Sequence, residues 1–425
     1  MTDDESLIAC HECDALYVQQ TIPVGARADC ARCGNPLYKN TENSASKSLA
    51  LYLSAFILLI IANVYPFLSM RTTGLEQVGL IYSGGLALYE FGMGELGLIV
   101  VLTSIVFPFL SVLGMLYLLI PHSFGLLPAF HQQVFRIVKA AEPWSLLSVF
   151  MLGTLVAVVK LQSLATVIPG IGLVSFCCML IVYSAARATF DPDELWSLSS
   201  VKQATTRDIT PGAAITNCHT CGLVRPYSDH THNCARCGAA VHHRNKDSVQ
   251  RTWAYLFAAS IMLIPANMLP IMTVKVLGSG HPDTIISGVI RLIESGLWGL
   301  ALIVLIASIV VPGLKLTALG YLLYSLKQGS DWRPRDRTLL YRITHMVGAW
   351  SMVDVFLVGL LAGLVKLGLI ATIEPGLGAT FFCAAVIMTI FAANNFDSRL
   401  IWDHALSTKS VEPDHTDNKR LRPIL

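Results

Sequence analysis

Long apolar runs alternate with shorter polar segments along this chain of 425 residues. Each run approaches or exceeds the roughly 20 residues that a helix needs to cross the hydrocarbon core of a bilayer. Helices are expected because a segment in lipid must satisfy its own backbone hydrogen bonds. The pattern therefore predicts eight membrane-spanning helices, with approximate limits at residues 49–68, 96–120, 145–167, 171–190, 253–273, 297–325, 350–371 and 376–394.

Proline and glycine divide these runs in a regular way. Pro169–Gly170 separates the third run from the fourth, and Pro375–Gly376 separates the seventh from the eighth. A tight Pro-Gly turn between two apolar runs predicts a helical hairpin in each case. Pro108 and Pro312 fall inside the second and sixth runs, where they are expected to kink or open the helix.

The chain repeats itself with a spacing of 204 to 206 residues. The motif NVYPF at Asn63–Phe67 returns as NMLPI at Asn267–Ile271, and Ser83–Gly92 returns as Ser287–Gly296. Further equivalent pairs are Pro108 and Pro312, Glu90 and Glu294, Trp144 and Trp350, Gly153 and Gly359, Lys160 and Lys366, Cys177 and Cys383, and Trp196 and Trp402. Each half has an even number of predicted helices, so the two halves share one orientation. Parallel repeats of this kind occur among transporters, and they also arise by duplication without any transport role.

Composition and charge place the repeat in a membrane. The chain is 54% hydrophobic and only 14% charged, with a mean hydropathy of +0.59, whereas a soluble protein has about 25% charged residues. The acidic start, MTDDESLIAC, is unlike a cleavable signal. Of the thirty lysines and arginines, three lie in the predicted outer loops, three within spans, and the other twenty-four on the inner side. The positive-inside rule therefore predicts that both termini are cytoplasmic.

Eight of the eleven cysteines form Cys-x-x-Cys pairs, grouped in two sets of four. The sets are Cys10, Cys13, Cys30 and Cys33, and Cys218, Cys221, Cys234 and Cys237. The intervals of sixteen and twelve residues between pairs are close to zinc-ribbon spacing. Four thiolates presented by two tight turns suit tetrahedral zinc, and the reducing cytosol favours metal over disulfides. We therefore predict two Zn²⁺ ions, both structural because a four-thiolate site leaves no open position for substrate.

Other uses of these cysteines stay open from the sequence alone. A redox-active or metal-sensing dithiol pair and an iron site are the alternatives to structural zinc. Zinc ribbons often bind nucleic acid, but these two precede membrane spans and lack a long basic run. No nucleic-acid partner is therefore predicted.

Lysines within the predicted spans are candidates for function, because ionisable side chains are costly in lipid. Lys160, Lys315 and Lys366 fall in such runs. Lys160 and Lys366 occupy equivalent places near the outer end, where a lysine either snorkels to the interface or lines a transport route. In the same seventh run, Gly359 and Gly363 form a GxxxG motif that predicts close helix packing.

Acidic residues mark three further positions. Asp354 follows Trp350 by one helical turn, which predicts a place near the inner headgroups, and its counterpart in the first half is Ser148. Glu90 and Glu294 lie in short outer segments that have the pattern of amphipathic surface helices. Each glutamate is either solvated there or contacts a periplasmic partner or a passing substrate.

The duplicated plan resembles the paraquat-inducible protein A family. The resemblance rests on NVYPF and NMLPI, on the segments Trp144–Lys160 and Trp350–Lys366, and on the closing FDPDELW and FDSRLIW. It covers nearly the whole chain, from Cys10 to Trp402. It implies an inner-membrane subunit that works with a periplasmic MCE-domain protein carrying lipids between two membranes, and a role in envelope integrity and tolerance of membrane stress. The family commonly has an acidic residue four positions after the tryptophan in both halves. In this chain only Asp354 matches, because the first half has Ser148 there, so any role of that acid in the family is carried over to Asp354 alone.

We therefore predict an all-α integral membrane protein of the cell inner membrane, with two tandem four-helix transmembrane modules, each preceded by a small β-rich four-cysteine zinc ribbon. The predicted boundaries are 1–46 for the first ribbon, 47–200 for the first module, 201–248 for the second ribbon, 249–404 for the second module and 405–425 for a disordered cytoplasmic tail.

The leading functional hypothesis is a non-enzymatic subunit that passes phospholipid to or from a periplasmic MCE-domain protein. The residues predicted to line the lipid route are Lys160, Lys366, Asp354, Pro108, Pro312, Glu90 and Glu294. No GxxxxGK[ST] motif is present, so this chain is not predicted to bind ATP by a P-loop. Two alternatives remain, a membrane-bound redox or zinc stress sensor and an ion-driven transporter of small solutes.

Overall fold

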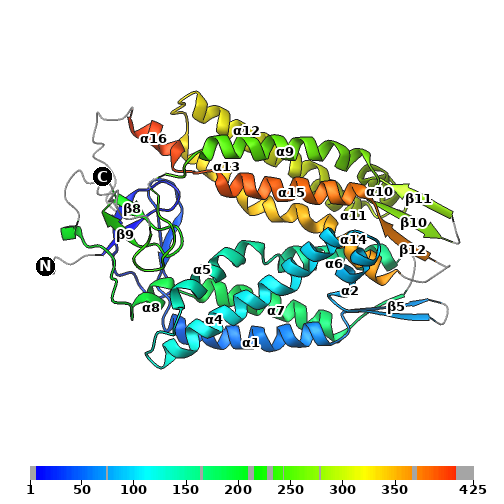
Figure 1. Cartoon of the computed structure of the whole chain (residues 1–425), viewed down its shortest axis with the longest axis horizontal. Coiled ribbons are helices and arrows are strands. Elements are labelled where there is room, and N and C mark those ends of the chain that lie inside the picture. Colours follow the sequence, from blue (N-terminus) through cyan, green and yellow to red (C-terminus); the bar gives the residue numbers. More distant parts are fainter. Residues whose placement is uncertain are drawn as a thin grey trace.

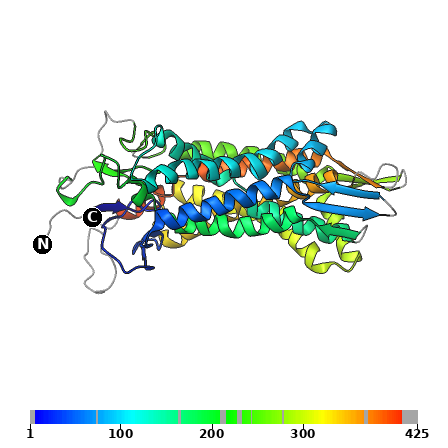
Figure 2. The same ribbon diagram turned by 90° about the horizontal axis from the view of Figure 1, so that it is seen from below.

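The computed structural model describes residues 6–72, 75–162, 166–208, 215–226, 233–242, 244–276, 279–365 and 371–407. Its helices run along one long axis, with small strands at both ends (Figures 1 and 2). The two cysteine ribbons lie together at one end, here called the ribbon end. Two three-stranded sheets lie at the opposite end, here called the sheet end. This arrangement confirms the fold class predicted from the sequence.

The first ribbon and the first half fill residues 7–196. The ribbon strands are β1 (Leu7–Ala9), β2 (Leu16–Val18), β3 (Arg27–Asp29) and β4 (Pro36–Lys39). The elements of the first half are α1 (Ser44–Val64), β5 (Leu68–Thr72), β6 (Leu75–Gly79), α2 (Ser83–Glu90), α3 (Gly94–Val101), η1 (Leu102–Val106), α4 (Phe107–Ser123), α5 (His131–Ala141), η2 (Glu142–Trp144), α6 (Leu147–Gln162), β7 (Thr166–Pro169), α7 (Ile171–Thr189) and α8 (Pro192–Trp196).

The second ribbon and the second half repeat this order. The ribbon contains η3 (Thr206–Asp208), β8 (Ile215–Asn217) and β9 (Val224–Pro226). The elements of the second half are α9 (Ser248–Met268), β10 (Met272–Val276), β11 (Ser279–Asp283), α10 (Ile285–Glu294), α11 (Trp298–Leu305), η4 (Ile306–Val310), α12 (Val311–Lys327), α13 (Pro334–Val347), η5 (Gly348–Met352), α14 (Val353–Leu364), β12 (Ala371–Pro375), α15 (Leu377–Asn395) and α16 (Leu400–Ser407).

Seven helical stretches among the described residues are long and apolar enough to cross a membrane. They are Ser44–Val64, Gly94–Ser123, His131–Val159, Ile171–Thr189, Trp298–Lys327, Pro334–Leu364 and Leu377–Asn395. The remaining predicted span, the fifth (253–273), corresponds to α9, which equals α1 in length and packs along α15 but is less apolar than these seven. The chain is therefore a multi-pass membrane protein by the apolarity of its helices.

At the sheet end the structure differs from the predicted helical hairpins, because the two helices of each pair are not joined by a Pro-Gly turn alone. A strand stands between the helices in each half: β7 pairs with β5, and β12 pairs with β10. The third and seventh helices therefore end earlier than the apolar runs suggest, at Gln162 and Leu364. The apolar run continues through the strand because residues such as Val167 and Ile168 are β-branched and pair on the sheet.

The mid-span prolines lie at a different kind of irregularity from the predicted kink. A π-helical segment precedes each one, Leu102–Val106 before Pro108 and Ile306–Val310 before Pro312. The hydroxyls of Ser104 and Ser308 donate to the carbonyls of Val100 and Val304 at 2.6 and 2.7 Å. The wider turn accommodates a residue without an N–H inside a continuous helical span, and it recurs at an offset of 204 residues.

The two halves meet closely through small residues. A Cβ at Gly84 of α2 would lie 2.8 Å from the carbonyl oxygen of Gly359, and one at Gly363 would lie 2.9 Å from the Cα of Gly84. The GxxxG motif of α14 therefore packs against the other half, as a small-residue motif allows. The equivalent of Gly84 in the second half, Gly288, has no atom within 4 Å of an added Cβ, so this contact is made on one side only.

Candidate metal centres and membrane groove

The first cysteine set forms a compact cluster at the ribbon end. The sulfurs of Cys10 and Cys33 lie 3.5 Å apart, as do those of Cys13 and Cys30, and all four Sγ atoms lie within 4.8 Å of one another. The four side chains are buried, and the hydroxyl of Tyr17 lies 3.2 Å from the Cys30 sulfur. Four buried thiols converging on one point are a metal-binding arrangement.

The second set repeats this geometry. The sulfurs of Cys218 and Cys237 are 3.5 Å apart, and so are those of Cys221 and Cys234. All four are buried and lie within 4.8 Å of one another. In both sets each Cys-x-x-Cys turn is closed by a backbone N–H four residues on, which donates to the carbonyl of the first cysteine.

The turns explain the glycines that follow three of the four pairs. Gly34, Gly222 and Gly238 have φ of +71°, +72° and +68°, a conformation that costs glycine least. Asp14 takes the same conformation, with φ of +59°, at the fourth turn. All four turns therefore use the left-handed backbone conformation, with glycine at three of them and an aspartate at the fourth.

The sulfur geometry fits a tetrahedral ion. Zinc–sulfur bonds of about 2.3 Å place neighbouring sulfurs roughly 3.8 Å apart, close to the observed 3.5 Å. Disulfides are excluded because an S–S bond is about 2.05 Å long, and the cysteines are free. Each group is thus able to hold one metal ion.

The first ribbon packs on the second half of the protein. The guanidinium of Arg342, on α13, donates to the carbonyl oxygens of Cys33 and Gly34 at 2.8 and 3.4 Å. The guanidinium of Arg32 lies over the Trp402 ring, 5.8 Å from its centre. The cysteines of this ribbon belong to an apolar cluster with residues of α12 and α15. The first ribbon therefore packs on the second half, although the first half follows it in the sequence.

The second ribbon packs in the same way on the first half. Arg136, on α5, donates to the carbonyl oxygen of Gly238 at 3.0 Å, and the guanidinium of Arg236 lies 5.8 Å from the centre of the Trp196 ring. Arg136 is the repeat equivalent of Arg342, and Arg236 is the equivalent of Arg32. The two ribbons are thus exchanged between the halves, and they contact each other through Leu7, Ala9, Leu16 and Val224.

A groove of about 380 Å³ opens between α12 and α13 in the second half. Its walls are mostly apolar, with Leu314, Tyr321 and Ile343 among the exposed residues. Lys315 lines it and is only 2% exposed. Its ammonium donates to the Thr389 hydroxyl at 2.7 Å and to the Gly348 carbonyl at 3.3 Å. The groove thus joins a long apolar wall to one buried cation.

The equivalent place in the first half is closed. Gly114 of α4 stands where Ala318 stands in α12, and a Cβ at Gly114 would overlap the side chain of Val138 on α5. The absent side chain lets Val138 of α5 pack directly on the backbone of α4. Ser111 replaces Lys315, and the Tyr183 hydroxyl, which replaces Thr389, faces it.

The predicted route residues are only partly brought together. Asp354 is buried, and it lines a small cavity with Met272, Asp283 and Thr284 near the sheet end. The prediction that Asp354 lies near the inner headgroups is therefore wrong, because α13 forms the ribbon-end part of the same span, which begins at Pro334. Lys160 lies on α6. Lys366 is outside the described residues, as is the side chain of Lys160, so their roles stay predictions.

The other predicted residues lie apart from the groove. Glu90 and Glu294 are the last residues of α2 and α10, and both are exposed. Pro312 borders a cavity of only about 10 Å³, and Pro108 is buried. Their places in a lipid route therefore also stay predictions.

Sequence reasoning missed the ribbon exchange and the groove. Arg136 and Arg342 fall at the repeat spacing of 206 residues, and this recurrence outside the apolar runs was a usable signal for a conserved contact between the repeats. Lys315 stands out as the lysine inside a span without a lysine counterpart in the other half. Nothing in the sequence pattern shows that α13 stands away from α12.

Comparisons with known proteins agree with the duplicated plan. The sequence model of the paraquat-inducible protein A family matches residues 45–200 and 249–405. Intermembrane transport protein PqiA of Escherichia coli (strain K12) is 31% identical, over 95% of this chain and 97% of its own length. The Lipophilic envelope-spanning tunnel protein A of the same strain is 30% identical, over 93% of this chain and 90% of its own length.

A third relative is the Probable intermembrane transport protein of Haemophilus influenzae, 30% identical over 93% of this chain and 95% of its own length. No solved structure matches the chain. The family match covers both halves, and the relatives align over almost their whole lengths. The chain belongs to the paraquat-inducible protein A family.

Proposed function

We propose that this protein is an inner-membrane subunit that moves phospholipid between the inner and outer membranes together with a periplasmic MCE-domain protein. In this role it supports envelope integrity and tolerance of membrane stress. The names of the relatives support intermembrane transport in the cell envelope. The groove between α12 and α13 is the observation that supports phospholipid as the transported molecule.

The groove combines the two features that a phospholipid requires. Acyl chains lie along apolar side chains such as Leu314 and Ile343, which are 62% and 50% exposed. The ammonium of Lys315 is a compact point charge for a phosphate oxygen. Two described acceptors use two of its three N–H groups, and a phosphate takes the third.

The metal centres have a structural role in this proposal. Each holds one Zn²⁺, and four thiolates leave no open position for a substrate or a water molecule. The ribbons and both termini face the cytoplasm, in accord with the charge distribution. The sheet end then faces the periplasm, where the MCE-domain partner binds. No catalytic step is assigned to this chain.

Photocrosslinking tests the groove. A photoreactive residue at Leu314 is expected to capture phospholipid that stays with the purified protein, and the variant Lys315→Met is expected to reduce capture at least tenfold. Methionine is about as long as lysine but has no charge, so Lys315→Met removes the ammonium group without leaving a large cavity. The captured lipid is identified by mass spectrometry, and envelope resistance to detergent is measured for the same variants.

The first half supplies the matched control. Leu110 is the repeat equivalent of Leu314, and it is also exposed, but α5 packs directly on α4 at Gly114, one turn further along the same helix. A photoreactive residue there is expected to capture several-fold less retained lipid. Equal capture at the two positions, or capture at Leu314 that is unchanged in Lys315→Met, contradicts the proposed cargo site.

A further inference from the structure

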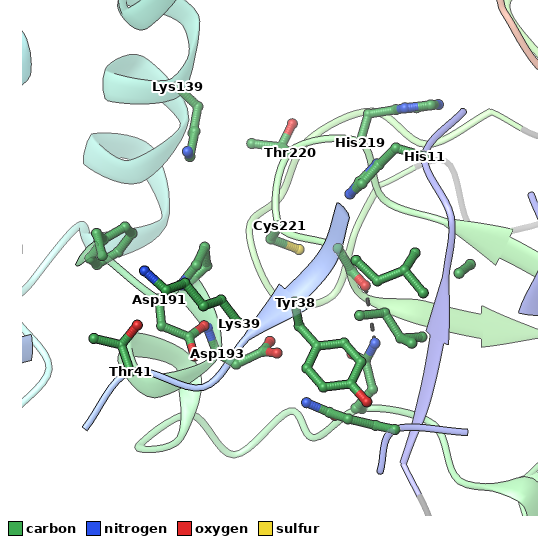
Figure 3. A pocket seen from close by; sticks show the side chains of 18 of the residues that line it. His11, Tyr38, Lys39, Thr41, Lys139, Asp191, Asp193, His219, Thr220 and Cys221 are labelled. Atoms are coloured by element: carbon green, nitrogen blue, oxygen red, sulfur yellow. Dashed lines mark hydrogen bonds between the residues drawn. The ribbon is translucent and has the colours of Figure 1, made fainter. Parts of the chain in front are cut away.

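A second cavity, of about 350 Å³, lies at the ribbon end between the two ribbons and the first half (Figure 3). It is here called the junction cleft. Its walls come from the first ribbon, from the second ribbon around Cys221, and from the ends of α5 and α7. Its volume falls within the roughly 300–1,000 Å³ of small-molecule sites. The residues that line it belong to the two ribbons and the first half, whereas the groove is lined by α12 and α13 of the second half.

The equivalent junction in the second half is filled by ion pairs. Arg399 binds Asp397 at 2.9 Å and lies 3.8 Å from Asp14. Arg244 binds Asp14 at 2.7 Å and Asp403 at 2.6 Å. Both side chains of the Arg399–Asp397 pair are less than 5% exposed. Among the described residues, charges of both signs therefore join the first ribbon directly to the second half.

Two sequence changes leave the junction cleft open in the first half. Asp193 stands at the repeat position of Arg399, and Gly222 stands at the position of Asp14 in its cysteine turn. Asp191, the equivalent of Asp397, keeps its carboxylate, so two acidic groups face a space from which the arginine is missing. Arg236 is near enough to act on the charge of Asp193, but it lies over Trp196 and donates to the Val201 carbonyl. The Gln19 side chain forms a neutral hydrogen bond with the Asp193 carboxylate.

Two lysines reach the same cleft from other elements. Lys39 extends from the end of β4 and Lys139 points in from α5 (Figure 3). Lys139 also binds Glu142 at 3.1 Å. Among the residues that the structure describes, Lys39, Asp191 and Asp193 form no ion pair. The cleft thus presents cationic and anionic groups that are not neutralised by each other.

We propose that the junction cleft binds a zwitterionic headgroup of the phosphoethanolamine type. The ammonium group of the ligand takes the place that Arg399 occupies in the second half and binds Asp191 and Asp193. The phosphate lies toward Lys39 and Lys139. The cleft is bounded by Thr189, the last residue of α7, where a membrane span ends and headgroups lie. The ligand therefore enters as a lipid headgroup, and this inference holds whether or not the groove carries cargo.

Native mass spectrometry of the full-length protein in detergent tests the proposal with three added lipids of matched chains. Phosphatidylethanolamine is expected to bind at least tenfold more tightly than phosphatidylglycerol, which lacks the ammonium, and than phosphatidylcholine, whose ammonium has no N–H to donate. Asp193→Arg introduces the residue of the second half and is expected to abolish this preference. Asp193→Asn, which adds no bulk, is expected to weaken phosphatidylethanolamine binding at least tenfold.

Controls separate the cleft from general lipid binding and from the groove. Lys246→Ala removes an exposed charge outside the cleft and is expected to change nothing. The lipid series is repeated in the Lys315→Met background, so that lipid held in the groove contributes less to the measured binding. Free phosphoethanolamine that competes as well as the lipid would identify a soluble ligand with the same chemistry. Equal binding of phosphatidylglycerol, or a preference that survives both Asp193 variants, overturns the proposal.

Discussion

The two halves share one scaffold and differ in what that scaffold encloses. Both have the π-helical segment before a mid-span proline, the three-stranded sheet and the exchanged ribbon. At the ribbon end the described residues form a cleft on the first half, whereas ion pairs join the ribbon to the second half. Within the membrane a groove opens between α12 and α13, whereas α5 packs directly on α4 at Gly114. Duplication has thus kept the framework, while the two cavities lie in different halves.

The separation follows from a few substitutions between equivalent positions. Gly114 and Ala318 differ by one methyl group at the place where α5 packs closely on α4 and a groove opens between α12 and α13. Ser111 and Lys315 differ by a charge at the same place. Asp193 against Arg399 decides whether the ribbon junction is filled. A comparison of equivalent positions is therefore more informative about function in this fold than either half alone.

Loss of one metal centre is the largest change that we expect, because a four-thiolate zinc site contributes on the order of 10 kcal/mol to folding. Cys33→Ser is expected to unfold the first ribbon and, through the lost contacts to Arg342 and Trp402, to loosen the second half. Hydrogen exchange is expected to rise in α13 and α16 and to stay low in α5. The matched variant Cys237→Ser is expected to act in the opposite sense, on α5.

This outcome depends on the exchange of the ribbons. If each ribbon packed on the half that follows it in the chain, Cys33→Ser would loosen α5 instead of α13. Bound zinc, measured at two per chain in the parent protein and one in each variant, verifies that a single site has been removed.

The contact between α2 and α14 gives a smaller expected effect. Gly84→Ala places a methyl group 2.8 Å from the Gly359 carbonyl oxygen, and overpacking of this kind costs about 1–3 kcal/mol. Gly288→Ala meets nothing within 4 Å, and it is expected to be neutral or to stabilise α10 slightly. Unfolding midpoints in a series of denaturing detergent mixtures measure both. Equal destabilisation by the two variants would mean that the halves also pack through α10.

The elements with a strong local signal could be predicted from the sequence. The cysteine spacing requires two turns that converge on one ion, and apolar runs of about 20 residues require membrane helices. The repeat pairs Trp144 with Trp350 and Pro108 with Pro312 at consistent offsets. The cysteine turns and the helices depend on residues that are near one another in the chain, and the repeat is found by comparing the sequence with itself.

The features that could not be predicted depend on contacts between distant segments. The strand Thr166–Pro169 reads as part of an apolar run, and only its pairing with β5 makes it a strand. Arg342 meets Cys33 across more than 300 residues, and neither residue type identifies its partner. The groove depends on the separation of two helices, which the small difference between Gly114 and Ala318 sets through packing rather than through any motif.

The smallest expected effect comes from the stacked pairs of the exchanged ribbons. A cation over an aromatic ring contributes about 0.5–1 kcal/mol at an exposed site and about 2 kcal/mol at a buried one. A double-mutant cycle with Arg32→Ala and Trp402→Leu removes the ring, and the hydrogen bond of Arg32 to the Cys13 carbonyl cancels from the coupling energy. The cycle with Arg236→Ala and Trp196→Leu is expected to give an equal or larger coupling, because both guanidinium groups lie 5.8 Å from the ring centre and Arg236 is only 5% exposed. The crossed cycle of Arg32 with Trp196 is expected to give none, and a coupling found only there would place each ribbon on its own half.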